Sequence, residues 1–210
     1  MNEYLEVIKG YSDEEELRNL EKWVSDYIVP LEKDKITWLN LRGQELREFL
    51  KKNYVDKQLI NNREVAYNVG WDKTFLRNVL GMRFMAFVNI IDNFNYLIGV
   101  IPNKINKQTI VSCLCYNKDH KLLNKEEIVN LIQYVETNAF YKKQGLFNLL
   151  TTLFASYMDY DKELVITDEW LEGIDCGTFE RLKQAMLNNG FEREIMIKSE
   201  AEKKNKQLIK

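Results

Sequence analysis

The segment Tyr141–Phe147, with the sequence YKKQGLF, carries residues suited to binding a phosphate group. From Gly145 onward, apolar residues recur with the i, i+3, i+4, i+7 spacing of one helix face. A helix N-terminus presents unpaired backbone N–H groups and the positive end of the helix dipole. A glycine there lets an anion approach the backbone, and Lys142 and Lys143 add positive charge. The sequence therefore predicts a phosphate-binding loop that opens a helix.

Other reactive side chains give little support for a different chemistry. Cys113 and Cys115 lie two residues apart in a strand-like run, so both point to one face. Two small core residues are favoured over a metal pair, because no third and fourth ligands are nearby. The single histidine, His120, falls in the polar stretch Asn117–Lys121, which we predict to be a loop. This isolation argues against Ser-His-Asp or Cys-His catalysis and against a histidine-rich metal site, so we expect no metal.

The predicted elements place the loop in an α/β fold with a mixed central sheet flanked by helices. Helices are predicted first, then a meander of strands, and then strand, helix, strand, helix and strand. The helices are predicted at Ser12–Ile28, Gln44–Tyr54 and Thr74–Leu80, and the strands of the meander at Arg83–Ile91, Tyr96–Ile101 and Gln108–Tyr116. Phe191–Lys198 alternates as a closing strand.

Three stretches in this order resemble the GNAT-type N-acetyltransferase superfamily. Tyr141–Phe147 resembles its acyl-CoA loop, which reads aromatic, basic, two variable positions, Gly, apolar, and then Gly or Ala. The strand ending in Val135-Glu136-Thr137 is similar to the family's central splayed strand, and Leu164–Asp168 resembles the next strand. Thr178–Phe191, which closes in a Gly-Phe pair, resembles the last helix and its exit. The resemblance extends over Asn95–Lys198 in order and spacing.

This resemblance implies a GNAT-like fold and an enzyme that transfers an acyl group from acyl-CoA, most simply acetyl-CoA, to an amine acceptor. The amine attacks the thioester directly, with no metal and no covalent enzyme intermediate. The strand end would hydrogen-bond the pantetheine arm, and the backbone of the loop would hold the pyrophosphate. The implied cofactor-binding residues are Val135, Thr137, Lys142, Lys143, Gln144, Gly145, Leu146 and Phe147.

Two carboxylates are candidate catalytic groups for this reaction. An acceptor ammonium must lose a proton before it can attack, and a carboxylate is a usual helper. Glu136 would lie close to the thioester, although a surface ion pair is the alternative role and strand alternation leaves its direction open. Asp168, with Glu169, would lie across the cleft and hold a cationic acceptor, or would cap the following turn.

The chain departs from the family pattern at two positions. Phe147 stands where the family often has Gly or Ala. Met186 stands where many members carry a tyrosine that protonates the leaving thiolate, and a thioether cannot donate a proton. A catalytically inactive acyl-CoA-binding or regulatory domain of the same fold is therefore an alternative to the enzyme. A plain protein-interaction domain without a ligand is a third possibility.

Composition sets the remaining expectations. The 210 residues carry a net charge of −2, which gives no general attraction to nucleic acid. The N-terminus lacks a signal-peptide pattern, and no apolar run approaches the ~20 residues of a membrane span, so we expect a cytoplasmic protein, monomeric or homodimeric, with no membrane partner. We divide the chain into an N-terminal helical extension or lid (1–80), a GNAT-like core (81–198) and a polar, frayed tail (199–210).

Overall fold

The computed structural model describes residues 25–53, 90–122, 128–167 and 177–208, and the statements below concern these residues. The elements in the first half are η1 (Lys33–Lys35), β1 (Thr37–Arg42), α3 (Gly43–Asn53), β2 (Asn95–Pro102) and β3 (Gln108–Lys121). Those in the second half are β4 (Ile128–Thr137), η2 (Ala139–Tyr141), α8 (Leu146–Ala155), β5 (Leu164–Ile166), α9 (Gly177–Asn188), β6 (Ile195–Ile197) and α10 (Lys198–Leu208).

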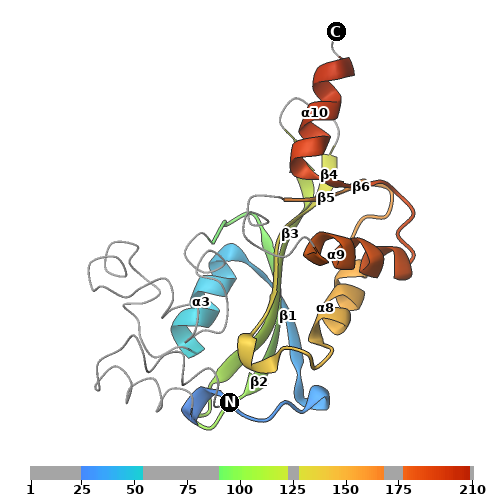
Figure 1. Cartoon of the computed structure of the whole chain (residues 1–210). Helices are drawn as coiled ribbons and strands as arrows, with labels where there is room; N and C mark the ends of the chain where they lie inside the picture. Colours follow the sequence, from blue (N-terminus) through green and yellow to red (C-terminus); the bar gives the residue numbers. More distant parts are fainter. Residues whose placement is uncertain (1–24, 54–89, 123–127, 168–176, 209–210) are drawn as a thin grey trace, which may run out of the picture.

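The strands form one six-stranded sheet in which sequence order and spatial order agree, from β1 to β6. The pairings β1–β2, β2–β3 and β3–β4 are antiparallel, whereas β4–β5 and β5–β6 are parallel. Parallel neighbours need a crossover connection, and α8 and α9 lie in the two connections concerned. The predicted α/β fold with a mixed central sheet flanked by helices is therefore confirmed (Figure 1).

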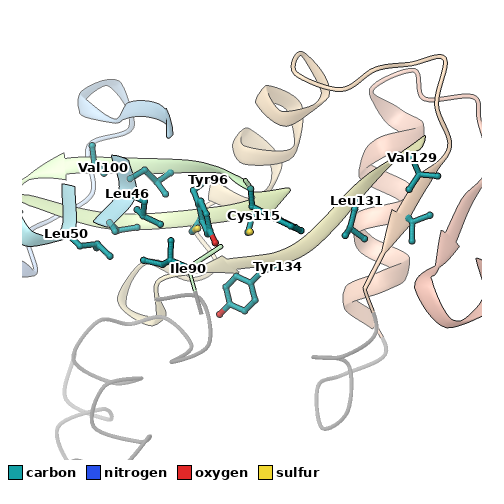
Figure 2. Packing of buried hydrophobic residues seen from close by; sticks show 14 of the residues in the cluster. Leu46, Leu50, Ile90, Tyr96, Val100, Cys115, Val129, Leu131 and Tyr134 are labelled. Atoms are coloured by element: carbon teal, nitrogen blue, oxygen red, sulfur yellow. The ribbon is translucent and has the colours of Figure 1, made fainter. Parts of the chain in front are cut away.

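The helices cover both faces of the sheet and divide its core into two parts (Figure 1). The α3-side core contains Leu46 and Leu50 of α3 packed on alternate residues of the strands. Figure 2 shows this part of the core, with Tyr96, Cys115 and Tyr134 projecting from three successive strands. The α8-side core contains residues of α8 and α9 packed on the other face, among them Leu150, Phe154, Leu182 and Met186.

The two cysteines of β3 lie on one face of the strand, as their spacing predicts. Cys113 and Cys115 are both buried in the α3-side core. Burial raises the pKa of the Cys113 thiol well above its ordinary value and raises the pKa of Cys115 to about 12. Both side chains are therefore neutral packing residues at physiological pH, which confirms the predicted core role.

Several predicted elements agree with the structure, and others need correction. The predicted helix at Gln44–Tyr54 is α3, and the strands predicted at Tyr96–Ile101 and Gln108–Tyr116 are β2 and β3. The predicted loop at Asn117–Lys121 is wrong, because β3 continues through His120 to Lys121. The closing strand is shorter than predicted, at Ile195–Ile197. The predicted helix Thr74–Leu80, most of the helix Ser12–Ile28 and most of the strand Arg83–Ile91 lie outside the described residues.

The C-terminal segment is a helix and not a frayed tail. α10 begins at Lys198, directly after β6, and runs to Leu208. Its Ala201 is buried in the α3-side core, which anchors the first turns of the helix. Lysine, glutamate, glutamine and alanine are all strong helix formers, so intrinsic propensity supports the helix.

β1 is a strand that the sequence analysis did not predict. It comes from ahead of residue 81, where we place the start of the core, and pairs with β2 in antiparallel register over its whole length. Leu39 and Leu41 pack on the α3-side core, and Trp38 packs on the α8-side core. The sheet therefore contains a strand from the predicted N-terminal extension (1–80) as well as the strands of the predicted core (81–198).

Candidate functional site

β4 contains a one-residue bulge at Gln133. The register with β3 passes from Cys115↔Tyr134 directly to Tyr116↔Ile132, which leaves Gln133 as the extra residue. Ile132 belongs to the α8-side core and Tyr134 to the α3-side core. Residues two apart in a regular strand share a face, but Ile132 and Tyr134 lie on opposite faces. Beyond the bulge, alternate side chains of β4 therefore point to the faces opposite to those expected from the residues before it.

The bulge coincides with the end of the pairing between β4 and β5. β5 is in register with Asn130–Ile132 of β4, and one further ladder bond runs from the Thr167 N–H to the Ile132 carbonyl at 3.0 Å. β4 itself continues to Thr137. A bulged strand bends, so β4 changes direction immediately beyond its last described pair with β5. We call Ile132, Gln133 and Thr167 the β4–β5 junction.

The loop after β4 is fixed to the sheet and to the segment before η1. The side chain of Asn138 accepts a hydrogen bond from the Phe140 N–H at 3.1 Å and donates one to the Ile110 carbonyl at 2.9 Å. The Tyr141 hydroxyl donates to the Val29 carbonyl at 2.9 Å and accepts from the Val29 N–H at 3.2 Å. Both side chains are buried, and burial raises the pKa of Tyr141. The loop is therefore attached by buried side chains to β3 on one side and to Val29 on the other.

Gly145 is the N-cap of α8 and has left-handed backbone angles, with φ +79° and ψ +9°. Lys143 also has a positive φ, of +63°, which is uncommon for a residue with a Cβ. No side chain of the described residues caps the helix start, and Lys142–Gly145 are exposed. The first N–H groups of α8 thus face an accessible loop, which is the geometry that a helix-terminal anion site requires.

A third lysine joins the two predicted ones. The ammonium of Lys33, in η1, lies 3.4 Å from the point where a Cβ on Gly145 would stand. Val29, which Tyr141 holds, is four residues earlier, so the loop and η1 are brought together by the same contact. Lys33 was missed because it lies in a different part of the sequence, and no local pattern connects it to Gly145.

The other predicted cofactor residues occupy two environments. Gln144 is exposed in the loop, whereas Leu146 is buried beneath it with Tyr141. Phe147 packs partly against the α8-side core, and Val135 is buried in the same core. The Thr137 hydroxyl lies 3.4 Å from the Ser112 hydroxyl at the end of β4. Leu146 and Val135 can therefore meet a ligand through backbone groups only, and their assignment to CoA stays a prediction.

Glu136 lies beyond the bulge, half-buried, and accepts a hydrogen bond from the Tyr134 hydroxyl. In the β3–β4 register it stands opposite Cys113. Its negative charge is one of the causes, after burial and Cys115, that raise the pKa of the Cys113 thiol. Glu136 is therefore on the α3 side of the sheet. The other predicted catalytic residue, Asp168, lies outside the described residues, as does Glu169.

Met186 fills the α8-side core and is 0% exposed. Its neighbours in this cluster include Leu182 of the same helix and Phe191, which follows α9. The position at which the resemblance places a tyrosine is therefore occupied by a packing residue. A thioether in this position has no proton to donate.

We expect Met186→Tyr to destabilise the protein by about 1–3 kcal/mol, because a larger polar side chain must enter a filled core. Thermal unfolding of the variant should show a lower melting temperature, and acyl-transfer activity should not rise. The exposed Leu187 provides the control, since Leu187→Tyr meets no such constraint and should leave the melting temperature nearly unchanged. A more active Met186→Tyr variant of unchanged stability would show that this position faces the reaction.

Comparison with known proteins gives few matches. Searches against protein-family models and against curated protein sequences found no match. Among solved structures, the chain is similar to an aminoglycoside acetyltransferase from an uncultured soil metagenomic sample in complex with trehalose, with 16% identity and a TM-score of 0.38 over 72% of this chain and 89% of that chain. For the same enzyme in complex with sisomicin, the identity is 14% and the TM-score is 0.39, over 72% of this chain and 88% of that chain.

Two further features concern the described residues alone. None of their helices is both long and apolar enough to span a bilayer. Their histidine, cysteine, aspartate and glutamate side chains form no group of three or more that could hold a metal ion.

Proposed function

We propose that this protein is an acyl-CoA-dependent N-acyltransferase that uses acetyl-CoA as its donor. The observation that supports the proposal is the course of the chain from the bulge in β4 to the start of α8. The strand bulges at Gln133, leaves its pairing with β5, and leads through an anchored loop to a left-handed glycine at a helix start. Lys142 and Lys143 lie in the loop before that helix start and the Lys33 ammonium lies beside it, which supports the binding of a polyphosphate.

In this proposal the CoA pyrophosphate accepts hydrogen bonds from the backbone N–H groups of Lys143–Phe147. Lys142, Lys143 and Lys33 supply the counter-charge. The pantetheine arm runs back along β4 and hydrogen-bonds the backbone at Val135 and Thr137 in the manner of an added strand. The thioester then lies near the β4–β5 junction, at the opposite end of this path from the loop.

Glu136 is the proposed general base. The amine acceptor approaches on the α3 side, where Glu136 accepts the Tyr134 hydrogen bond. Glu136 takes a proton from the ammonium, the amine nitrogen attacks the thioester carbonyl carbon, a C–N bond forms and the C–S bond breaks. The second proton leaves the nitrogen as the thiolate departs, and the thiolate is protonated by way of solvent, since Met186 has no proton to give. Asp168, which would hold a cationic acceptor, stays a prediction.

Acetyl-CoA is expected to raise the melting temperature of the protein. A ligand that binds only the native state adds about 2.7 kcal/mol of stability at a hundredfold excess over its Kd. Thermal unfolding should be followed with acetyl-CoA, with CoA and without ligand, and ATP serves as a control for non-specific polyphosphate binding. An unchanged melting temperature with acetyl-CoA and with longer acyl-CoAs would favour the interaction domain without a ligand.

A second function, a catalytically inactive acyl-CoA-binding or regulatory domain, is favoured by the burial of Met186 in the core. Release of free thiol from acetyl-CoA separates the two functions. The measurement requires a panel of acceptors, including small amines, an aminoglycoside and peptides with a free N-terminus or lysine. Thiol release with one of them supports the enzyme, and tight binding with no release from any of them supports the regulatory domain.

A further inference from the structure

Thr167 has a buried hydroxyl group with no hydrogen-bond partner. Its side chain is 0% exposed, and its Oγ1 is the one buried side-chain polar atom among the described residues that lacks a partner. Leaving a hydroxyl unpaired away from water has a free-energy cost, and such groups in folded proteins call for an explanation. The other buried threonines, Thr109 and Thr151, both donate to backbone carbonyls.

The position of this hydroxyl is defined by the sheet. The Thr167 N–H donates to the Ile132 carbonyl, so the ladder between β4 and β5 includes Thr167 and ends next to the bulge. Leu164 and Ile166 belong to the α8-side core, and Val165 belongs to the α3-side core. Alternation along the strand places Thr167 on the same face as Val165. The bulge places Tyr134 and Glu136 on that face too.

The phosphate loop and Thr167 lie at the two ends of one path. Thr137 lies five positions after Ile132 in β4, which corresponds to at most about 17 Å along the strand. An extended pantetheine arm can cover such a length, so a CoA whose pyrophosphate is at Gly145 would bring its acyl end to the β4–β5 junction. The acyl end has one strong hydrogen-bond acceptor, the thioester carbonyl oxygen, and no donor. The unpaired hydroxyl of Thr167 has a proton to donate.

We infer that the Thr167 hydroxyl donates a hydrogen bond to the thioester carbonyl oxygen of the bound acyl-CoA. This inference rests on the proposed function. The bond holds the carbonyl in place for attack from the side of Glu136, and it strengthens as the oxygen gains negative charge in the tetrahedral intermediate. No bond within Thr167 forms or breaks. The hydroxyl remains unpaired in the free protein because its partner belongs to the ligand.

The test is Thr167→Val, which replaces the hydroxyl by a methyl group of similar size. Removal of an unpaired buried hydroxyl should raise the melting temperature of the ligand-free protein. The same change should weaken acetyl-CoA binding about tenfold, because the carbonyl loses its donor. Binding of CoA, which has no thioester, should stay the same. Thr167→Ser keeps the hydroxyl and should retain wild-type affinity for acetyl-CoA. Titration calorimetry measures the affinities of the wild type and of both variants for acetyl-CoA and for CoA.

Thr109→Val is the matched control. Thr109 is equally buried, but its hydroxyl donates to the Tyr27 carbonyl at 2.6 Å. This variant should lower the melting temperature and leave both affinities unchanged. Unchanged acetyl-CoA affinity in a folded Thr167→Val variant would overturn the inference, and so would an equal loss for acetyl-CoA and CoA. If the wild-type protein binds neither compound, the proposed function itself fails, so the two failures are distinguishable.

Discussion

Replacing Gly145 by valine is expected to weaken acetyl-CoA binding about a hundredfold or more while the protein stays folded. Gly145 has φ +79°, where a β-branched residue is strained by roughly 1–2 kcal/mol or more. The backbone relieves that strain by leaving the left-handed region, which redirects the N–H groups at the start of α8. Hydrogen bonds to charged groups contribute about 1.5–3 kcal/mol each, so loss of two of them accounts for the expected effect.

The chain provides a closely matched control in Gly190. This glycine follows α9, has φ +83°, and has no heavy atom within 4 Å of an added Cβ. Gly190→Val therefore introduces the same kind of backbone strain outside the phosphate loop. Both variants should lose stability to a similar degree, and only Gly145→Val should lose affinity in a calorimetric titration. Wild-type affinity in folded Gly145→Val would remove the loop from the proposed site.

The second large effect is expected for Glu136→Gln. If Glu136 is the general base, the substitution should lower kcat by about 10²–10⁴ and leave acetyl-CoA affinity nearly unchanged. Glutamine keeps the size of the side chain and can still accept a hydrogen bond from Tyr134, so the loss is confined to proton transfer. Thiol release with the best acceptor gives kcat, and titration calorimetry gives the affinity.

Glu192→Gln is the control for a change of charge, because Glu192 is exposed. It should have wild-type kcat. Tyr134→Phe tests the immediate environment of the base, since it removes the hydroxyl that donates to Glu136, and its effect should be smaller than that of Glu136→Gln. Full activity of Glu136→Gln would show that another group takes the proton, and Asp168→Asn would then be the next variant to measure.

The parts of the fold with strong local periodicity were predictable from the sequence. The helix predicted at Gln44–Tyr54 is α3. The loop before α8 was predictable because glycine and the apolar helix face adjoin each other in sequence. These features depend on residues within one or two turns of each other, so a local pattern contains them.

The features that the sequence did not predict depend on pairing between distant segments. The bulge at Gln133 has no signature in composition, because it exists only relative to the register of β3. The approach of Lys33 to Gly145 and the unpaired hydroxyl of Thr167 are likewise properties of the assembled sheet. α10 was mistaken for a frayed tail because its polar composition was given more weight than the helix propensity of its residues.

The contact between Tyr141 and Val29 couples the proposed anion binding at Gly145 to the packing of residues 29–35 against the loop. Tyr141 holds Val29 by two hydrogen bonds, and Lys33 follows four residues later. If Lys33 strengthens phosphate binding by a certain free energy, thermodynamic linkage requires that the bound phosphate stabilise the packing of residues 29–35 by the same free energy. The proposed ligand would therefore hold residues 29–35 and the loop at Gly145 together. Any change that loosens residues 29–35 would in turn weaken ligand binding at Gly145.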